Sequence, residues 1–326
     1  MIIDAHVHLN SVDDTFLEYA IKNNIKLLSI ITDIPTFPSV EDQLNIVLRL
    51  KEKYPDHVDF VCTFPCWNWG KPNWLQQSLD YIERGLEQGA VGVKVWKNIG
   101  MSITDTAGQY VMIDHPSFEP IFKFLEDNNI VLLGHVGEPK NCWLPLEEMT
   151  VESDKEYFRS NPEYHMFNNP SMPSYDEQLN ARDKVLDKHP DLKFVGLHLA
   201  SLEWSVQKVG EFLDKFPNTM VDLAERICHL QFQAVSEWKK VYDFFIKYQD
   251  RIIYGTDIIV ADGAFIEGDF TYIEKKYTDH REFFLGTEPM RVPKVSREFN
   301  GLGLPKEVVQ KIYVDNALKA YPRMKG

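Results

Sequence analysis

The chain opens with Met1-Ile2-Ile3-Asp4-Ala5-His6-Val7-His8, an apolar run that carries two histidines two residues apart. In a β-strand, residues two apart project from the same face, so both imidazoles point the same way. Short apolar runs rich in valine and isoleucine recur along the chain, separated by longer segments of helical period. This alternation is typical of parallel strands joined by crossover helices. The opening stretch is therefore interpreted as the first strand of an α/β fold.

Eight such apolar runs can be counted in the 326 residues. They cover residues 2–8, 26–32, 58–64, 91–96, 130–136, 193–199, 219–223 and 251–256. Eight strand–helix units make a (β/α)8 or TIM barrel, a fold that commonly reaches this length as one domain. We therefore expect a single domain over residues 1–326. Ser39 with Asp42 resembles a helix capping box, and Gly89 stands where a left-handed helix end is expected.

Two connections are too long to be simple turns: residues 137–173 after the fifth strand and residues 258–303 after the eighth. Both leave the C-terminal end of a strand, where the loops of a barrel build the active site. We expect these long loops to form a lid or a substrate pocket. Decoration without contact to substrate is the alternative.

Composition limits the class of partner. The net charge of −14 argues against broad contact with nucleic acid or anionic membranes, which attract basic patches. Four scattered cysteines are too few for a disulfide scaffold, so reduced and mostly buried thiols are expected. The opening lacks a signal-peptide pattern, and no apolar stretch is long enough to cross a bilayer. We expect a cytoplasmic protein that binds a small-molecule substrate, with no nucleic-acid or membrane partner, and a homo-oligomer stays open.

Polar residues end several of the apolar runs. His135 ends the fifth run, His198 the sixth and Asp257 the eighth. With His6 and His8 they fall at one end of the barrel, because the C-terminal ends of parallel strands share that end. Each residue alone has an ordinary explanation, such as a structural histidine or a turn. Together they predict a divalent cation, most simply Zn²⁺, with Mn²⁺, Fe²⁺ or Co²⁺ as alternatives.

The other histidines are not expected at this site. His57 and His189 precede the third and sixth strands, so they belong to the opposite end of the barrel. The remaining four lie in predicted helices or loops and are expected at the surface: His115, His165, His229 and His280.

These motifs resemble the amidohydrolase superfamily, specifically the amidohydrolase-related or amidohydrolase 2 branch that includes aminocarboxymuconate semialdehyde decarboxylase. The resemblance runs nearly end to end. It is carried by Asp4-Ala-His6-Val-His8, Gly92-Val-Lys94-Val, Gly134-His135-Val-Gly137-Glu138-Pro139, Gly196-Leu-His198, Val221-Asp222-Leu-Ala-Glu225-Arg226, Tyr254-Gly-Thr-Asp257 and the closing Gly303-Leu-Pro305 to Asn316-Ala317.

The resemblance implies that His6, His8, His135 and Asp257 are metal ligands and that His198 is a catalytic group. A bound metal lowers the pKa of water towards neutrality. Asp257 can then take the proton of the water and pass it to a leaving group. His198 would orient or polarise the substrate carbonyl.

Four residues are candidate substrate-binding groups: Lys94, Glu138, Arg226 and Trp143. Arg226 has an equally good explanation in a structural ion pair. Lys94 has two interpretations, because binuclear relatives carboxylate a lysine on this strand and use it to bridge two metals. The resemblance is closer to the mononuclear branch, so we expect an unmodified amine that bonds a carboxylate or the substrate.

The leading functional hypothesis is hydrolysis of an amide, ester or lactone by metal-activated water. The alternative is non-oxidative decarboxylation of an unsaturated or aromatic carboxylic acid, a lyase reaction on the same scaffold. Thr32-Asp33-Ile34-Pro35, after the second strand, offers no arginine for a substrate carboxylate, which places decarboxylation second. A barrel that keeps its metal without catalysis is a third reading.

Overall fold

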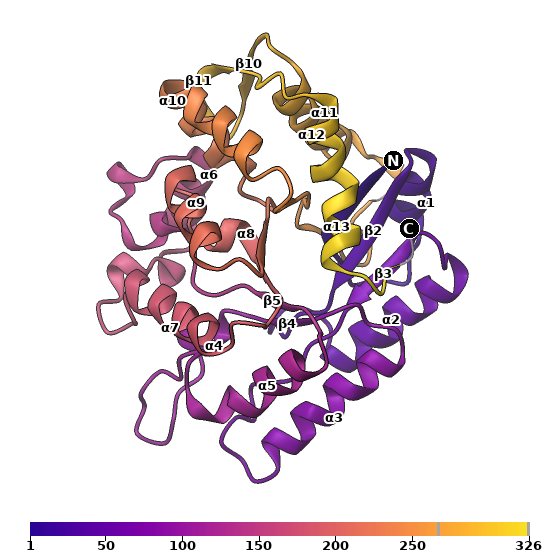
Figure 1. The fold of residues 1–326 in the computed structure, drawn as a ribbon, viewed down its shortest axis with the longest axis vertical. Coiled ribbons are helices and arrows are strands. Elements are labelled where there is room, and N and C mark those ends of the chain that lie inside the picture. The colour runs from indigo at the N-terminus through magenta and orange to yellow at the C-terminus, as the bar shows by residue number, and fades with distance from the viewer. Residues whose placement is uncertain (266–267, 325–326) are drawn as a thin grey trace.

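The computed structural model describes residues 1–265 and 268–324 (Figure 1). Every predicted apolar run contains a strand, and the paired neighbours in the ring are parallel. The strands are β1 (Ile2–Leu9), β2 (Ile25–Ile30), β3 (Val58–Val61), β4 (Val93–Val95), β5 (Leu132–Gly134), β6 (Phe194–Gly196), β7 (Thr219–Asp222), β8 (Ile252–Ile253) and β9 (Ile258–Val260).

The strands form two parallel sheets, in the orders β3-β2-β1-β9 and β4-β5-β6-β7-β8. On one side, a parallel bridge between Cys62 and Val93 joins the two sheets. On the other side, the Ala5 amide donates to the carbonyl of Tyr254 at 3.0 Å, and the Asp257 amide donates to the carbonyl of His6 at 2.8 Å. The sheets therefore close into a ring, as a (β/α)8 barrel requires.

The closure between the first and eighth strands includes a buried polar network. The Asp4 carboxylate accepts from the Thr256 amide at 3.0 Å and from the Thr256 hydroxyl at 2.6 Å, across 252 residues of sequence. The Tyr277 hydroxyl donates to the same carboxylate at 2.6 Å. Because Thr256 bonds Asp4 and the next residue has a φ of +61°, the eighth strand breaks here. The predicted strand over 251–256 is thus shorter than expected, and pairing with β1 resumes in β9.

Helices cover the outside of the ring (Figure 1). They are α1 (Thr15–Lys22), α2 (Val40–Lys53), α3 (Trp74–Glu87), α5 (Glu119–Asp127), α7 (Tyr175–Lys188), α9 (Val206–Lys215), α10 (Ile227–Lys247), α12 (Lys306–Gln310) and α13 (Asn316–Ala320), with the single turns α4 (Asn98–Met101) and α8 (Leu197–Ala200). Ser39 caps α2 by accepting from the Asp42 amide at 3.1 Å, and Gly89 has a φ of +97°, so both predicted helix boundaries are confirmed.

Both long connections contain ordered structure. The fifth holds η2 (Lys140–Trp143), η3 (Leu146–Glu148), α6 (Glu152–Ser160), η4 (Pro162–Tyr164) and η5 (Met166–Asn168). The eighth holds β9, α11 (Thr271–Leu285) and a hairpin of β10 (Pro289–Val292) and β11 (Val295–Asn300). The Glu152 amide donates to the carbonyl of Lys294 at 3.1 Å, so the two connections touch. The remaining short turns are η1 (Pro116–Phe118) and η7 (Lys311–Asp315).

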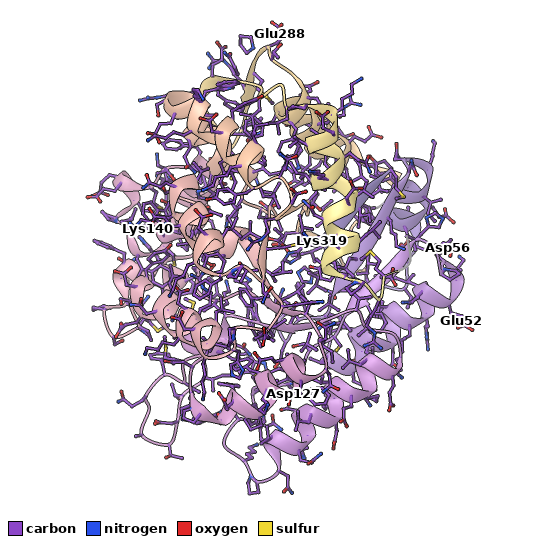
Figure 2. All side chains as sticks on the ribbon, viewed as in Figure 1. Glu52, Asp56, Asp127, Lys140, Glu288 and Lys319 are labelled. Carbon is purple, nitrogen blue, oxygen red and sulfur yellow. The ribbon has the colours of Figure 1, made fainter. Side chains whose placement is uncertain are left out.

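One hydrophobic cluster includes buried side chains from Ile3 to Met324. All four cysteines are buried and free, as expected from the sequence. Charged side chains such as Glu52 and Glu288 lie at the edge of the molecule in Figure 2, and Asp127 is exposed as well. Among the described residues, no helix is both long and apolar enough to span a membrane.

Candidate metal centre

The five polar residues predicted at the strand ends come together at one end of the barrel. His6 Nε2 lies 3.3 Å from Asp257 Oδ1, and His8 Nε2 lies 3.2 Å from the same oxygen. The ring of His198 lies 4.9 Å from that of His6 and 4.2 Å from that of His135, measured between centroids. The four histidines are buried, with at most 8% of the surface of each exposed. The sequence thus predicted the gathering of these residues correctly.

Three of the imidazoles are fixed by a hydrogen bond at Nδ1, on the side of the ring away from Nε2. His6 Nδ1 bonds Asp222 Oδ2 at 2.6 Å, His8 Nδ1 bonds the carbonyl of Ile30 at 2.7 Å, and His198 Nδ1 bonds the carbonyl of Ala224 at 2.9 Å. A carbonyl oxygen can only accept, so Nδ1 of His8 and His198 carries the proton. This fixes the tautomer that leaves the Nε2 lone pair towards the centre, an arrangement common around histidine ligands.

The donor atoms fit a divalent cation. Two ligands of a tetrahedral ion with bonds of about 2.0–2.2 Å lie roughly 3.3–3.6 Å apart, close to the separations of His6 and His8 from Asp257. Among the described residues, the Nε2 atoms of His6 and His135 are buried without a hydrogen-bond partner. Burial of an unpaired polar atom is costly, and a cation would remove that cost.

Burial lowers the pKa of His6, His8, His135 and His198, which keeps these histidines neutral. The pKa of His198 falls to about 3. Burial alone would raise the pKa of Asp257, but the neighbouring histidines hold it well below its usual range. Neutral imidazoles and an ionised carboxylate are the forms that bind a metal ion.

His135 stands slightly apart from the tightest group. The donor atoms of His6, His8 and Asp257 all lie within 4.8 Å of one another, and a second such group consists of His6, His198 and Asp222. Since Asp222 already bonds His6 Nδ1, the second group is better explained as an orienting contact. His135 contacts His198 instead, and its Nε2 is buried without a hydrogen-bond partner among the described residues.

Asp222, at the end of β7, connects two of the histidines. Its carboxylate bonds His6 Nδ1 and also accepts from the backbone amide of His198. Burial raises the pKa of Asp222 to about 6. The amide of His198 reaches Asp222 because the backbone turns left-handed directly after β6, with positive φ from His198 to Ser201. Such a run is strained for residues other than glycine and persists only where the surroundings impose it.

We expect Asp222→Asn to weaken metal binding by about 10–100-fold, the usual effect of losing a group that orients a histidine ligand. An amide keeps the size of the side chain but accepts from His6 and His198 less strongly than a carboxylate. The measurement is the dissociation constant of the metal in competition with a chelator. Asp59→Asn is the matched control, since Asp59 is a buried strand carboxylate that pairs with lysines instead. Equal weakening in both variants would contradict an orienting role for Asp222.

A second group of buried charges lies around Arg226, the residue that precedes α10. Burial works against its charge, but the carboxylates of Asp154, Glu203 and Glu138 outweigh burial and raise the pKa of Arg226. His229 Nε2 lies 3.4 Å from Asp154 Oδ2. Among the described residues, Arg226 Nε, Glu203 Oε2 and both ring nitrogens of His229 are buried without hydrogen-bond partners. Arg226 also lowers the pKa of His6, His135 and His198, so its charge acts on the centre.

The candidate substrate-binding residues divide into two sets. Lys94 is 1% exposed, and burial lowers its pKa to about 8 against the attraction of Asp257 and Asp222. Glu138 forms an ion pair with Lys97. Trp143 instead packs on Tyr175, and its indole donates to the carbonyl of Pro173 at 3.3 Å. Trp143 therefore uses its polar atom within the long fifth connection, and no contact described for it joins it to the centre.

Three predictions about other histidines were wrong, and two held. His165 and His229 are buried rather than at the surface, because the long fifth connection forms a small core of its own and α10 begins beneath it. His280 is half-buried and bonds the Tyr254 hydroxyl at 3.0 Å. His115 is exposed, as predicted. His189 bonds Glu126 and Glu119 of α5, consistent with its exclusion from the centre.

Asp154, Glu203 and His229 were missed as neighbours of the centre. Asp154 comes from α6, Glu203 from the turn after α8, and His229 from α10. No motif or spacing connects these three segments. Only the folded arrangement of the long fifth connection over the barrel brings them to Arg226.

Solved structures resemble the chain nearly end to end. An uncharacterised TIM-barrel protein from Bordetella bronchiseptica is 15% identical, with 99% of each chain covered and a TM-score of 0.54. A 2,6-dihydroxybenzoate decarboxylase from Rhizobium is 13% identical, with 98% of each chain covered and a TM-score of 0.57. A 4-oxalomesaconate hydratase from Rhodopseudomonas palustris is 13% identical, with 99% of this chain and 96% of the hydratase covered and a TM-score of 0.53. These likenesses confirm the predicted fold class.

Among curated protein sequences, none matches the chain. A family model described as amidohydrolase matches residues 40–323. The matched range contains His135, His198 and Asp257, and it begins after His6 and His8. Since the match extends over most of the chain, the protein belongs to the amidohydrolase family, in its amidohydrolase 2 branch.

Proposed function

We propose that the protein is a metal-dependent hydrolase that cleaves an amide, ester or lactone bond. The observation that carries the proposal is the convergence of His6 Nε2, His8 Nε2 and the Asp257 carboxylate on one point. In this proposal His6, His8, His135 and Asp257 hold one divalent ion, with Zn²⁺ as the first choice for nitrogen-rich ligands. The buried and unpaired Nε2 of His135 supports its inclusion.

The residues of the centre suit proton transfer. A bound divalent ion lowers the pKa of water and polarises a carbonyl oxygen. Asp257, which its surroundings keep ionised, accepts a proton from the attacking water and returns it to the leaving group. One residue thus acts first as a base and then as an acid.

His198 takes a different part from the carbonyl polariser expected from the sequence. Polarising a carbonyl would need an Nε2–H, but the proton of the neutral ring is committed at Nδ1 to the carbonyl of Ala224. A pKa of about 3 disfavours the doubly protonated ring. We therefore assign His198 Nε2 as an acceptor that orients the attacking water.

The charges around the centre favour a substrate without a carboxylate. Lys97 is paired with Glu138, and Arg226 is balanced by Asp154 with Glu203 close by. A carboxylate substrate would add negative charge beside three carboxylates whose attractions for these two cations are already satisfied. A neutral amide, ester or lactone requires no such compensation.

Decarboxylation is the second candidate. The specific observation in its favour is the buried cation of Arg226, whose Nε is unpaired among the described residues and whose charge acts on the histidines. Arg226, Lys94 or Lys97 would then hold the substrate carboxylate. The similar structure from Rhizobium is that of a decarboxylase, which agrees with this alternative, although the likeness is one of fold.

We expect a screen of lactones, esters and amides to reveal metal-dependent turnover before a screen of aromatic and unsaturated carboxylates does. Hydrolysis is followed by proton release for the lactones and esters and by the freed amine for the amides, and the carboxylate library is followed by CO2 release. The control is the same protein after removal of its metal by a chelator, which should be inactive in both. Metal-dependent CO2 release with no hydrolysis would reverse the ranking of the two candidates.

A further inference from the structure

A cavity of about 150 Å³ lies beside the barrel mouth, between α10, α11 and the hairpin of β10 and β11. Figure 1 shows these elements together at the top of the view. The walls of the cavity include Ile227, Gln231, Tyr272, Lys276, Val292 and Lys294. The described residues that line the cavity include none of the five side chains of the metal centre. The cavity is therefore a separate feature that the proposed function does not use.

One buried polar group in the wall lacks a partner. Gln231 is 3% exposed, and among the described residues its Nε2 has no hydrogen-bond acceptor. Buried amide donors are nearly always bonded in folded proteins, so an unpaired one needs an explanation. Gln231 lines the cavity, so an occupant with an acceptor oxygen would supply the missing bond once the amide turns towards it.

The charges of the wall favour an anion. Lys276 and Lys294 both bond the single carboxylate of Glu225, one on each oxygen. Lys275, also in the wall, is balanced by Asp279. Two ammonium groups that share one carboxylate leave one positive charge in the same wall that holds the unpaired amide of Gln231. A carboxylate is the group that satisfies both.

The rest of the wall is apolar and limits the size of the occupant. Ile227, Tyr272 and Val292 present carbon surfaces to the cavity. An apolar cavity of about this volume accommodates a benzene molecule. We propose that the cavity binds a small monocarboxylate with an apolar body of about benzene size, for which benzoate is the simplest probe.

The position of the cavity allows an occupant to influence the metal centre through the residues between them. Lys276 Nζ donates to the carbonyl of Thr256 at 2.8 Å, and Thr256 directly precedes Asp257. Glu225, the shared partner of both lysines, directly precedes Arg226. An anion that competes with Glu225 for these lysines therefore acts on groups attached to the backbone of the centre.

The test is a titration of the metal-loaded protein with benzoate. Binding is measured by calorimetry and by ligand-observed NMR. Lys294→Met and Gln231→Leu each remove one polar contact and should weaken binding by about tenfold or more. Val292→Phe fills the cavity and should abolish binding. Lys239→Met is the matched control, because Lys239 is an exposed lysine of α10 outside the cavity, and it should bind benzoate like the wild type. Benzylamine, which has the same ring with a positive charge, should not bind.

Carboxylates also bind metal ions, so the site of binding needs its own control. The double variant His6→Ala with His8→Ala should retain benzoate binding. Loss of binding in that variant together with normal binding in Val292→Phe would move the ligand to the metal centre and overturn the proposal. Absence of saturable binding to the wild type would overturn it as well. Gln231→Leu, which preserves size and touches no ion pair, keeps the test valid if Lys294→Met fails to fold.

Discussion

Replacing Asp257 with asparagine is expected to lower turnover by about 10²–10⁴-fold, the range that a positioned acid–base group contributes. The metal content should fall much less, because an amide oxygen can still coordinate weakly while His6 and His8 keep their geometry. Turnover should fall more than metal content because Asp257 is proposed both to coordinate the metal and to transfer a proton. The amide retains part of the coordination but cannot transfer the proton. Metal content per chain and kcat are measured on the same preparation.

The matched control for this variant is Asp262→Asn. Asp262 is an exposed carboxylate that follows β9 and bonds the Ser11 hydroxyl, and it does not belong to the donor group of His6, His8 and Asp257. Its conversion should leave turnover within about twofold, as is usual for surface substitutions. Loss of metal and activity in strict proportion in Asp257→Asn would mean that the carboxylate serves only as a ligand.

Joint replacement of His6 and His8 by alanine is expected to reduce the metal content from about one ion per chain to nearly none. Both donors lie within 3.3 Å of the Asp257 carboxylate, so their loss leaves one member of the tightest donor group. Elemental analysis of the purified protein after dialysis gives the result. A second ion per chain in the wild type would instead support the binuclear arrangement in which Lys94 is carboxylated.

The control for the double variant is His57→Ala with His115→Ala. These histidines lie outside the centre, and His115 is exposed, so the same two losses of imidazole should not change the metal content. An unchanged metal content in His6→Ala with His8→Ala would place the metal elsewhere and refute the proposed site.

The strands could be predicted because a strand that is buried on both faces has an almost continuously apolar sequence. Parallel strands in a barrel appear in the sequence as continuous runs of valine and isoleucine. These runs can be recognised without knowing the conformation of the loops. Their C-terminal ends were less predictable. The predicted sixth run ends in His198 and Leu199, yet both have left-handed φ values and lie beyond β6. Strain of this kind follows from tertiary contacts and has no signal in a local pattern.

The candidate site was predictable in part for the same reason. His6, His8, His135, His198 and Asp257 stand at strand ends, and the symmetry of a barrel gathers strand ends whatever the loops do. The surroundings of Arg226 depend on contacts between distant segments. No sequence pattern therefore predicted that Asp154 and Glu203 lie near Arg226. The assignment of Trp143 to the substrate stays a prediction. Its ring packs on Tyr175 of α7 and its indole donates to the carbonyl of Pro173, two contacts that no local pattern predicts.

The network that joins Asp4 to Thr256 also bears on how the protein assembles. Its two partners are separated by 252 residues, so the bonds form only after the first and eighth strands meet. Contacts of such long sequence separation are slow to form, because the entropy of closing the chain must be lost before they are gained. During synthesis, this edge of β1 stays unpaired until residue 256 of the 326 has been made. The same event that protects that edge also completes the donor set, since His6 and His8 belong to β1 and Asp257 follows β8. An ion that binds this set recognises only the closed ring and, by mass action, stabilises it against reopening.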